Sequence, residues 1–220
     1  EETYIVDRAG KITTSAGMEV ELESILNGGK VEEPSGFDAE TINIEVSVPM
    51  EGHTGITLKN LVNMVYSKQA LIKKSLGITG NIIEPEFCKS INEGKIESLD
   101  DFRAAIESIG EKHCPGIAFD FNNSNVTFKF LKGEASLEKV QAYTQLIGLL
   151  NQNAKALKHA SAKSKDTDND KFTFRVFLIR LGMVGDEYKV ARKVLLENLE
   201  GNSAFRSGKK PEKNIVADAE

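Results

Sequence analysis

The strongest constraint on the fold is a long stripe of apolar residues in the second half of the chain. Between Ser136 and His159, apolar side chains recur every three or four residues, which is the spacing of one helix face. The members are Val140, Tyr143, Ile147, Leu150, Ala154 and Leu157. We therefore predict a helix over 136–159. Its apolar seam must pack on a sheet or on a partner.

Alternating segments earlier in the chain predict such a sheet. Isoleucine and valine occupy every second position from Ile42 to Val48, the period of a half-buried strand. Two β-hairpins are predicted, one over 4–13 around a glycine turn and one over 117–130 around the asparagine-rich turn 122–125. Residues 18–22 read as a further strand, although 19–26 also fits a short helix.

Helical spacing accounts for most of the remaining chain. A helix over 58–76 ends at Gly77, a short one begins at Pro85, and Ser98 with Asp101 opens a third with a capping-box pattern. Residues 171–181 have strand-like composition but keep helical spacing at Phe172, Val176 and Ile179, so we predict a helix. A last helix is predicted over 186–199, with its acidic start favouring the helix dipole.

Together these segments predict an α+β protein, with small antiparallel sheets, packed helices and a helical C-terminal half. Strand, helix, hairpin and helix follow one another as in part of a split βαβ arrangement, with 82–110 inserted. We divide the chain into an N-terminal hairpin region (1–35), an α+β core ending in the long helix (36–160), a helical hairpin (161–205) and a flexible basic tail (206–220). Residues 28–36 and 161–170 read as linkers.

Composition narrows the class of protein. No apolar run approaches the roughly 20 residues needed to cross a bilayer, so we expect no membrane association. Cys88 and Cys114 are the only cysteines, too few for a disulfide framework and suited to a reducing compartment. These features predict a cytoplasmic protein.

Metal-binding and catalytic patterns fail on spacing. Asp166, Asp168 and Asp170 start like a calcium loop, but Lys171 stands where glycine is needed and Phe177 where a glutamate should bind. The better interpretation is a solvated connector whose last acids cap the next helix. The cysteines and histidines have no zinc spacing, and the adjacent His113 and Cys114 lack a nucleophile motif. We assign no catalytic residue, metal or cofactor.

One loop has the composition of an anion site. Gly52, His53, Thr54 and Gly55 precede the helix over 58–76, and free amides at a helix start can hold an anion. In the simpler interpretation the glycines meet turn geometry while Thr54 or Thr57 caps the helix.

Charge is distributed unevenly along the chain. Residues 1–150 carry 14 Lys/Arg against 23 Asp/Glu, a balance of −9, while residues 151–220 carry 14 against 10, a balance of +4. The two parts could simply attract each other, or the second could bind an anionic partner. The candidate nucleic-acid-binding residues lie on one face of the last helix and in the tail: Lys189, Arg192, Lys193, Arg206, Lys209 and Lys210. A plain helical hairpin with a solvated basic face is the alternative.

Several runs resemble a known family. They are residues 181–189 (LGMVGDEYK), 192–196 (RKVLL), 201–205 (GNSAF) and 51–55 (EGHTG), the last followed by 61–76. They resemble an uncharacterised bacterial family of Gram-positive anaerobes, labelled virulence-related and carried on mobile elements. The resemblance implies a mobile-element context and an additional N-terminal segment. It implies no activity and no catalytic residues.

From these observations we expect a binding or interaction protein rather than an enzyme, with nucleic acid as the first partner to test. A protein partner and self-association stay open. One alternative is an oligomerising structural or assembly protein that uses the apolar seam of 136–159. The other is an enzyme with an anion site at 52–55.

Overall fold

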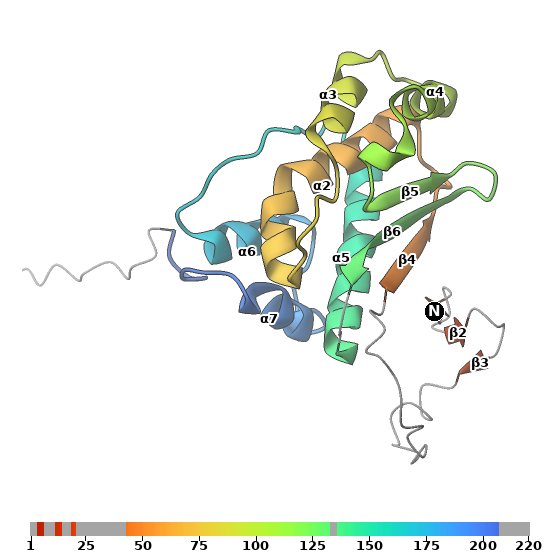
Figure 1. Cartoon of the computed structure of the whole chain (residues 1–220). Helices are drawn as coiled ribbons and strands as arrows, with labels where there is room; N and C mark the ends of the chain where they lie inside the picture. The colour runs from red at the N-terminus through yellow and green to blue at the C-terminus, as the bar shows by residue number, and fades with distance from the viewer. Residues whose placement is uncertain (1–3, 7–11, 15–18, 21–42, 133–135, 207–220) are drawn as a thin grey trace, which may run out of the picture.

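The computed structural model describes residues 4–6, 12–14, 19–20, 43–132 and 136–206. They form an α+β protein of two small antiparallel sheets and packed helices (Figure 1), which confirms the predicted fold class. The strands are β1 (Tyr4–Val6), β2 (Ile12–Thr14), β3 (Glu19–Val20), β4 (Asn43–Pro49), β5 (Ile117–Asp120) and β6 (Asn125–Lys132). The helices are α2 (Gly55–Leu76), α3 (Pro85–Glu93), α4 (Leu99–Ile109), the 3-10 turn η1 (Glu111–His113), α5 (Leu137–Ala156), α6 (Asp170–Arg180) and α7 (Lys189–Glu197).

The larger sheet has the strand order β4-β6-β5. Both outer strands run antiparallel to β6, so β4 and β5 are parallel to each other with β6 between them. This is the predicted split βαβ arrangement, with α3 and α4 inserted between α2 and β5. The register of β4 shifts between Ile44 and Val46, a bulge of the kind that bends a strand.

The smaller sheet contains the predicted N-terminal hairpin. Strand β1 pairs antiparallel with β2, and β2 pairs with β3, which confirms a strand at Val20. Strand β1 also contacts β4 of the larger sheet. The hairpin turn, the alternative helix beyond Val20 and the linker over 28–36 lie outside the described residues.

Helix α5 lies against the larger sheet and also packs on α2 and α7 (Figure 1). Its Tyr143 meets Phe130 of β6 edge to face, with ring centroids 5.1 Å apart. The predicted seam is buried at Tyr143, Ile147 and Leu150, whereas Leu157 lies beyond the helix end and is 41% exposed. The seam is therefore covered within this chain at Tyr143, Ile147 and Leu150.

Local sequence sets most helix ends as predicted. Thr54 and Thr57 form a capping box at the start of α2, and Ser98 with Asp101 forms another at α4. Gly77 ends α2 in the left-handed conformation, with φ at 73°. At α6 the expectation that acidic residues form the cap is wrong, because the side chain of Asn169 accepts the amide of Phe172 instead.

The C-terminal helices are shifted relative to the predictions. Helix α7 begins at Lys189 rather than at Asp186, so its first turn holds no acidic residue and the expected dipole contribution is absent. Helix α6 confirms the helical interpretation of 171–181, yet its buried residues include Phe174 and Leu178 rather than the Phe172, Val176 and Ile179 stripe. That stripe lies on the opposite face, where Ile179 is 37% exposed.

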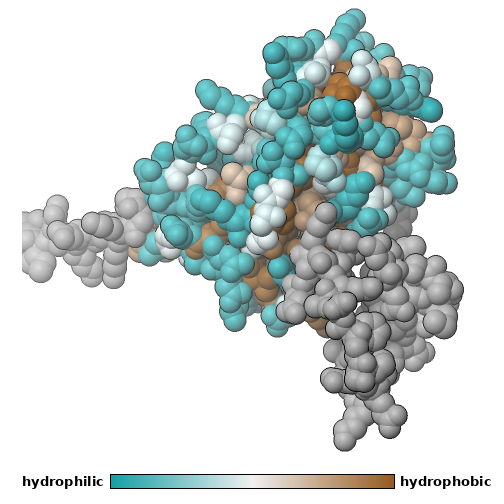
Figure 2. Space-filling view, viewed as in Figure 1, coloured by the Kyte–Doolittle hydropathy of each residue, from teal (hydrophilic) through white to brown (hydrophobic). Residues whose placement is uncertain are grey.

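Hydrophilic residues dominate the face of the molecule in Figure 2, and hydrophobic ones show mainly in the gaps between them. Within the described residues, no helix combines the length and the apolar character needed to span a membrane.

Two glycines provide a test of the packing. A Cβ at Gly55 would overlap with the carbonyl oxygen of Ser98 and lie 2.8 Å from Ile96 Cγ2, whereas a Cβ at Gly148 in α5 meets nothing within 4 Å. We expect Gly55→Ala to lower the free energy of unfolding by about 1–3 kcal/mol through overpacking. Gly148→Ala should raise it by about 0.5–1 kcal/mol through helix propensity. Urea denaturation measures both, and equal effects would contradict this account.

Candidate functional site

The 52–55 loop is held from several sides. Gly52 has a φ of 77°, a turn conformation that glycine favours, and Thr54 caps α2. Gly55 packs directly against the backbone of Ser98. The side chain of Lys155 reaches the loop and its Nζ donates to the Glu51 carbonyl oxygen at 2.6 Å. These contacts match the simpler interpretation, in which the glycines and threonine build a turn and a cap.

His53 of this loop is a buried structural residue. Its Nε2 lies 2.6 Å from Oδ1 of Asn151 on α5, an acceptor, so Nε2 carries the proton. Its Nδ1 lies 3.0 Å from the Thr57 hydroxyl. Burial lowers the pKa of His53 below its ordinary value, opposed by the Asn151 hydrogen bond and assisted by the charge of Lys155. A neutral imidazole that ties the loop to α5 does not offer a charge to an anion.

The thiols are equally enclosed. Cys88 and Cys114 are both buried and free, and burial raises the pKa of the Cys88 thiol to about 11 and that of Cys114 to about 12. A thiol with so high a pKa is a poor nucleophile at neutral pH. Among the residues described here, no group of three His, Cys, Asp or Glu side chains could hold a metal ion.

The predicted basic face of α7 is divided by the structure. Lys189 and Lys193 are exposed, but the guanidinium of Arg192 donates to the carbonyl oxygen of Met183 at 3.0 Å and so holds the preceding turn. Arg206 is exposed near the end of the described residues. Lys209 and Lys210 lie outside them.

A second set of cations comes together at positions that no sequence pattern indicates. Lys68 of α2, Arg180 at the end of α6 and Lys165 of the connector between α5 and α6 form what we call the basic cluster. Lys68 is half-buried, and its Nζ lies 5.9 Å from the ring centroid of Phe177 on α6. Burial lowers the pKa of Lys68, and the charges of Arg180 and Lys165 lower it further.

The basic cluster is not neutralised by the rest of the described chain. The ion pairs found there involve Lys74, Lys89, Lys95 and Arg103, and none of the three cluster residues. No carboxylate contributes to the pKa shift of Lys68. Three cations that repel one another across a half-buried lysine would be stabilised by a bound anion.

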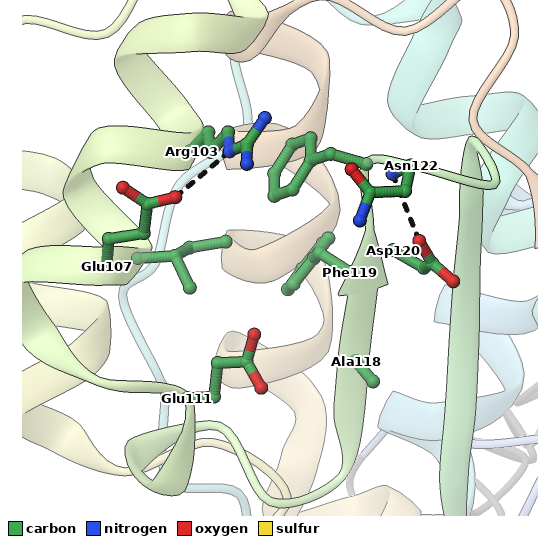
Figure 3. Close-up of a pocket in the computed structure, with 9 residues that line it drawn as sticks. Arg103, Glu107, Glu111, Ala118, Phe119, Asp120 and Asn122 are labelled. Carbon is green, nitrogen blue, oxygen red and sulfur yellow. Dashed lines mark hydrogen bonds and ion pairs between the residues drawn. The ribbon is translucent and has the colours of Figure 1, made fainter.

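A groove of about 350 Å³ lies on another part of the surface, between α4 and β5 (Figure 3). Its floor is apolar, with Ile106 and Phe119 among the lining residues, and its rim carries Glu107, Glu111 and Asp120. Arg103 Nε lies 2.9 Å from Glu107 Oε1, and the Arg103 guanidinium lies over the ring of Phe121 at 5.7 Å. We call this depression the β5 groove.

Neither the basic cluster nor the β5 groove could be predicted from the sequence, and the reason is the same for both. Lys68 and Arg180 are 112 positions apart in the sequence, and neither is part of a pattern that predicts a binding site. The sequence shows the helical period of α2 and the charge of α6. Tertiary packing decides that these two helices bring their cations together.

Comparisons with known proteins add no relative: no family model matches this chain, and no curated protein or solved structure matches it either. The resemblance to a mobile-element family therefore stays an expectation.

The lowered pKa of His53 predicts a pH dependence of stability. Between pH 6.5 and its folded pKa, His53 binds a proton more readily in the unfolded chain, so the free energy of unfolding should fall as pH drops below about 6.5. The loss should not exceed about 1.4 kcal/mol per pH unit. Urea denaturation of the wild type and of His53→Gln at several pH values measures it. His53→Gln should reduce the dependence of the free energy of unfolding on pH. The control His159→Gln, at an exposed histidine, should leave that dependence unchanged.

The basic cluster predicts a perturbed lysine. Lys68 should titrate below its ordinary pKa in an NMR titration of lysine side chains. Arg180→Gln should raise that pKa because it removes one repelling charge, whereas Lys189→Gln on α7 should leave it unchanged. A Lys68 pKa that does not respond to Arg180→Gln would remove the cluster as an electrostatic unit.

Proposed function

We propose that this chain is a non-enzymatic protein that binds the phosphate backbone of nucleic acid through the basic cluster of Lys68, Lys165 and Arg180. The observation that carries this proposal is the half-buried Lys68, which lies 5.9 Å from the ring centroid of Phe177 and makes no ion pair within the described residues. Burial lowers its pKa, and the charges of Arg180 and Lys165 lower it further. A bound phosphate would offset the repulsion between these cations, and this would add to the affinity. Phosphate contacts supply most of the sequence-independent affinity of proteins for nucleic acid. A role in mobile-element biology is part of the same proposal.

The surroundings of the cluster favour nucleic acid over a single small anion. The three cations come from three different segments, and Lys165 and Arg180 are exposed, so the cluster is open to an extended polyanion. The partly buried ring of Phe177 lies beside Lys68. Cations interleaved with an aromatic side chain are typical of surfaces that follow a nucleic-acid backbone.

The proposal keeps the C-terminal part as the binding region but moves its centre from α7 to α6. Exposed Lys189 and Lys193 would extend the positive surface, whereas Arg192 is committed to the Met183 carbonyl. The assembly alternative is less favoured, because the seam of α5 is covered by the sheet and by α2 and α7.

The test is a salt titration of binding to labelled duplex and single-stranded DNA. The variant Lys68→Gln/Lys165→Gln/Arg180→Gln should bind more weakly. Its slope of log K against log salt should be smaller by about one for each phosphate that the variant no longer binds. It should stay folded, because the substitutions remove repulsion and no ion pair of the described residues.

Two control variants separate the cluster from total charge. Lys89→Gln/Lys95→Gln/Lys112→Gln removes the same number of positive charges from exposed positions elsewhere and should bind better than the cluster variant at every salt concentration. Lys189→Gln/Lys193→Gln tests α7 separately. If the cluster variant and the first control lose affinity equally, binding reflects net charge alone. If the wild type does not bind DNA at low salt, the proposed function is wrong.

A further inference from the structure

We propose that the β5 groove binds an extended peptide segment with basic side chains, which adds as a strand to the outer edge of β5. This surface lies apart from the basic cluster and would take a partner of the opposite charge. The inference rests on the free backbone of the strand, on the acidic rim and on the apolar floor.

Within the described residues, Phe119 of β5 has unpaired backbone groups on the side that faces the groove. Lys129 of β6 donates to the Gly116 carbonyl oxygen, and hydrogen-bonding pairs alternate along an antiparallel ladder. From the register, Ala118 and Asp120 direct their backbone groups to β6. The N–H and C=O of Phe119 therefore point away from β6. No other backbone group of the described residues pairs with them.

The chain itself already uses the first part of this edge. The amide of Gly116 donates to the Ile82 carbonyl oxygen at 2.9 Å, and the amide of Glu84 donates to the His113 carbonyl oxygen at 2.9 Å. This cover reaches Ile117, the first residue of β5, whose amide donates to the Cys114 carbonyl oxygen at 3.2 Å. The groove thus follows a paired stretch of backbone and leaves Phe119 open to a strand from another chain.

The charge of the rim selects a basic partner. Arg103 is paired with Glu107, which leaves Glu111 as the groove carboxylate that no basic side chain of the described residues neutralises. The carboxylate of Glu111 extends into the groove in Figure 3. Asp120 points away from the groove in Figure 3, where hydrogen bonds from Asn123 and Asn122 hold the pKa of its carboxyl below the ordinary value.

The floor provides apolar contact between these charges. Phe119 stands edge to face with Phe102, ring centroids 5.1 Å apart, which fixes its ring as part of a rigid surface. Partly buried Phe121 lies at the end of the strand. Side chains alternate along an extended peptide, so one residue can contact the floor while its neighbour reaches an acid. A volume of about 350 Å³ accommodates a few side chains and not a folded domain.

The test uses defined peptides and the full chain. The probe is a fluorescein-labelled hexapeptide, Thr-Lys-Val-Lys-Val-Thr, with blocked ends, and its counterpart with glutamate in place of lysine. Fluorescence anisotropy should show binding of the lysine peptide and at least tenfold weaker binding of the glutamate peptide. Glu107→Gln/Glu111→Gln should weaken the lysine peptide at least fivefold. Glu97→Gln/Glu138→Gln, at exposed acids away from the groove, should not.

Strand addition is tested through the backbone. Two further peptides carry N-methyl groups on alternate residues, one on the odd positions and one on the even. Only one of them should lose binding, because one set of amides faces β5. Hydrogen exchange of the Phe119 amide should slow when the unmodified peptide is added.

Three results would overturn the inference: no binding of the lysine peptide, equal binding of the glutamate peptide, or equal loss with both methylated peptides. The variant Lys68→Gln/Lys165→Gln/Arg180→Gln should bind the lysine peptide at least as well as the wild type. The result of this experiment is therefore independent of whether the chain binds DNA.

Discussion

Two buried asparagines of α2 hold the described core together. The side chain of Asn60 donates to the Leu157 carbonyl oxygen and accepts the amide of Ala160, which fixes the segment after α5. Asn63 donates to the Ala160 carbonyl oxygen and exchanges hydrogen bonds with Asn92 at the end of α3. Since an unpaired buried amide costs about 1–3 kcal/mol, α2, α3 and the chain after α5 must keep this one arrangement.

The same helix also fixes the C-terminal pair. The hydroxyl of Ser75 donates to the Leu195 carbonyl oxygen of α7, and Asn198 returns a bond to the Ser75 carbonyl oxygen. Lys74 pairs with Asp170 at the start of α6, 2.6 Å apart. Helices α6 and α7 are thus placed by α2, and the meeting of Lys68 with Arg180 and Lys165 follows from that placement. The candidate site depends on the polar bonds of α2 although it contains none of them.

The sequence predicted what depends on near neighbours. The capping pair at Ser98, the stop at Gly77 and the alternation leading to Val48 are local, and the structure confirms them. The topology was also predictable, because strand, helix, hairpin and helix leave few arrangements open. The asparagine network was not, because Asn63 and Asn92 lie 29 positions apart and polar residues carry no periodic signal. The spacing of Phe172, Val176 and Ile179 predicted the helix α6 but not its buried face, since apolar residues lie on both faces.

The net charges of the two parts of the chain do not predict how the parts pack. The opposite balances of the two parts of the chain suggest that they attract each other, yet one ion pair that joins them within the described residues has the reverse sense. Lys74 comes from the acidic part and Asp170 from the basic part. Asp170 is thereby engaged by α2 and does not neutralise the cations of its own part. The excess positive charge of the C-terminal part is consequently left on the surface, where Arg180 and Lys165 repel Lys68. A surface with that property favours any polyanion that can reach all three cations at once.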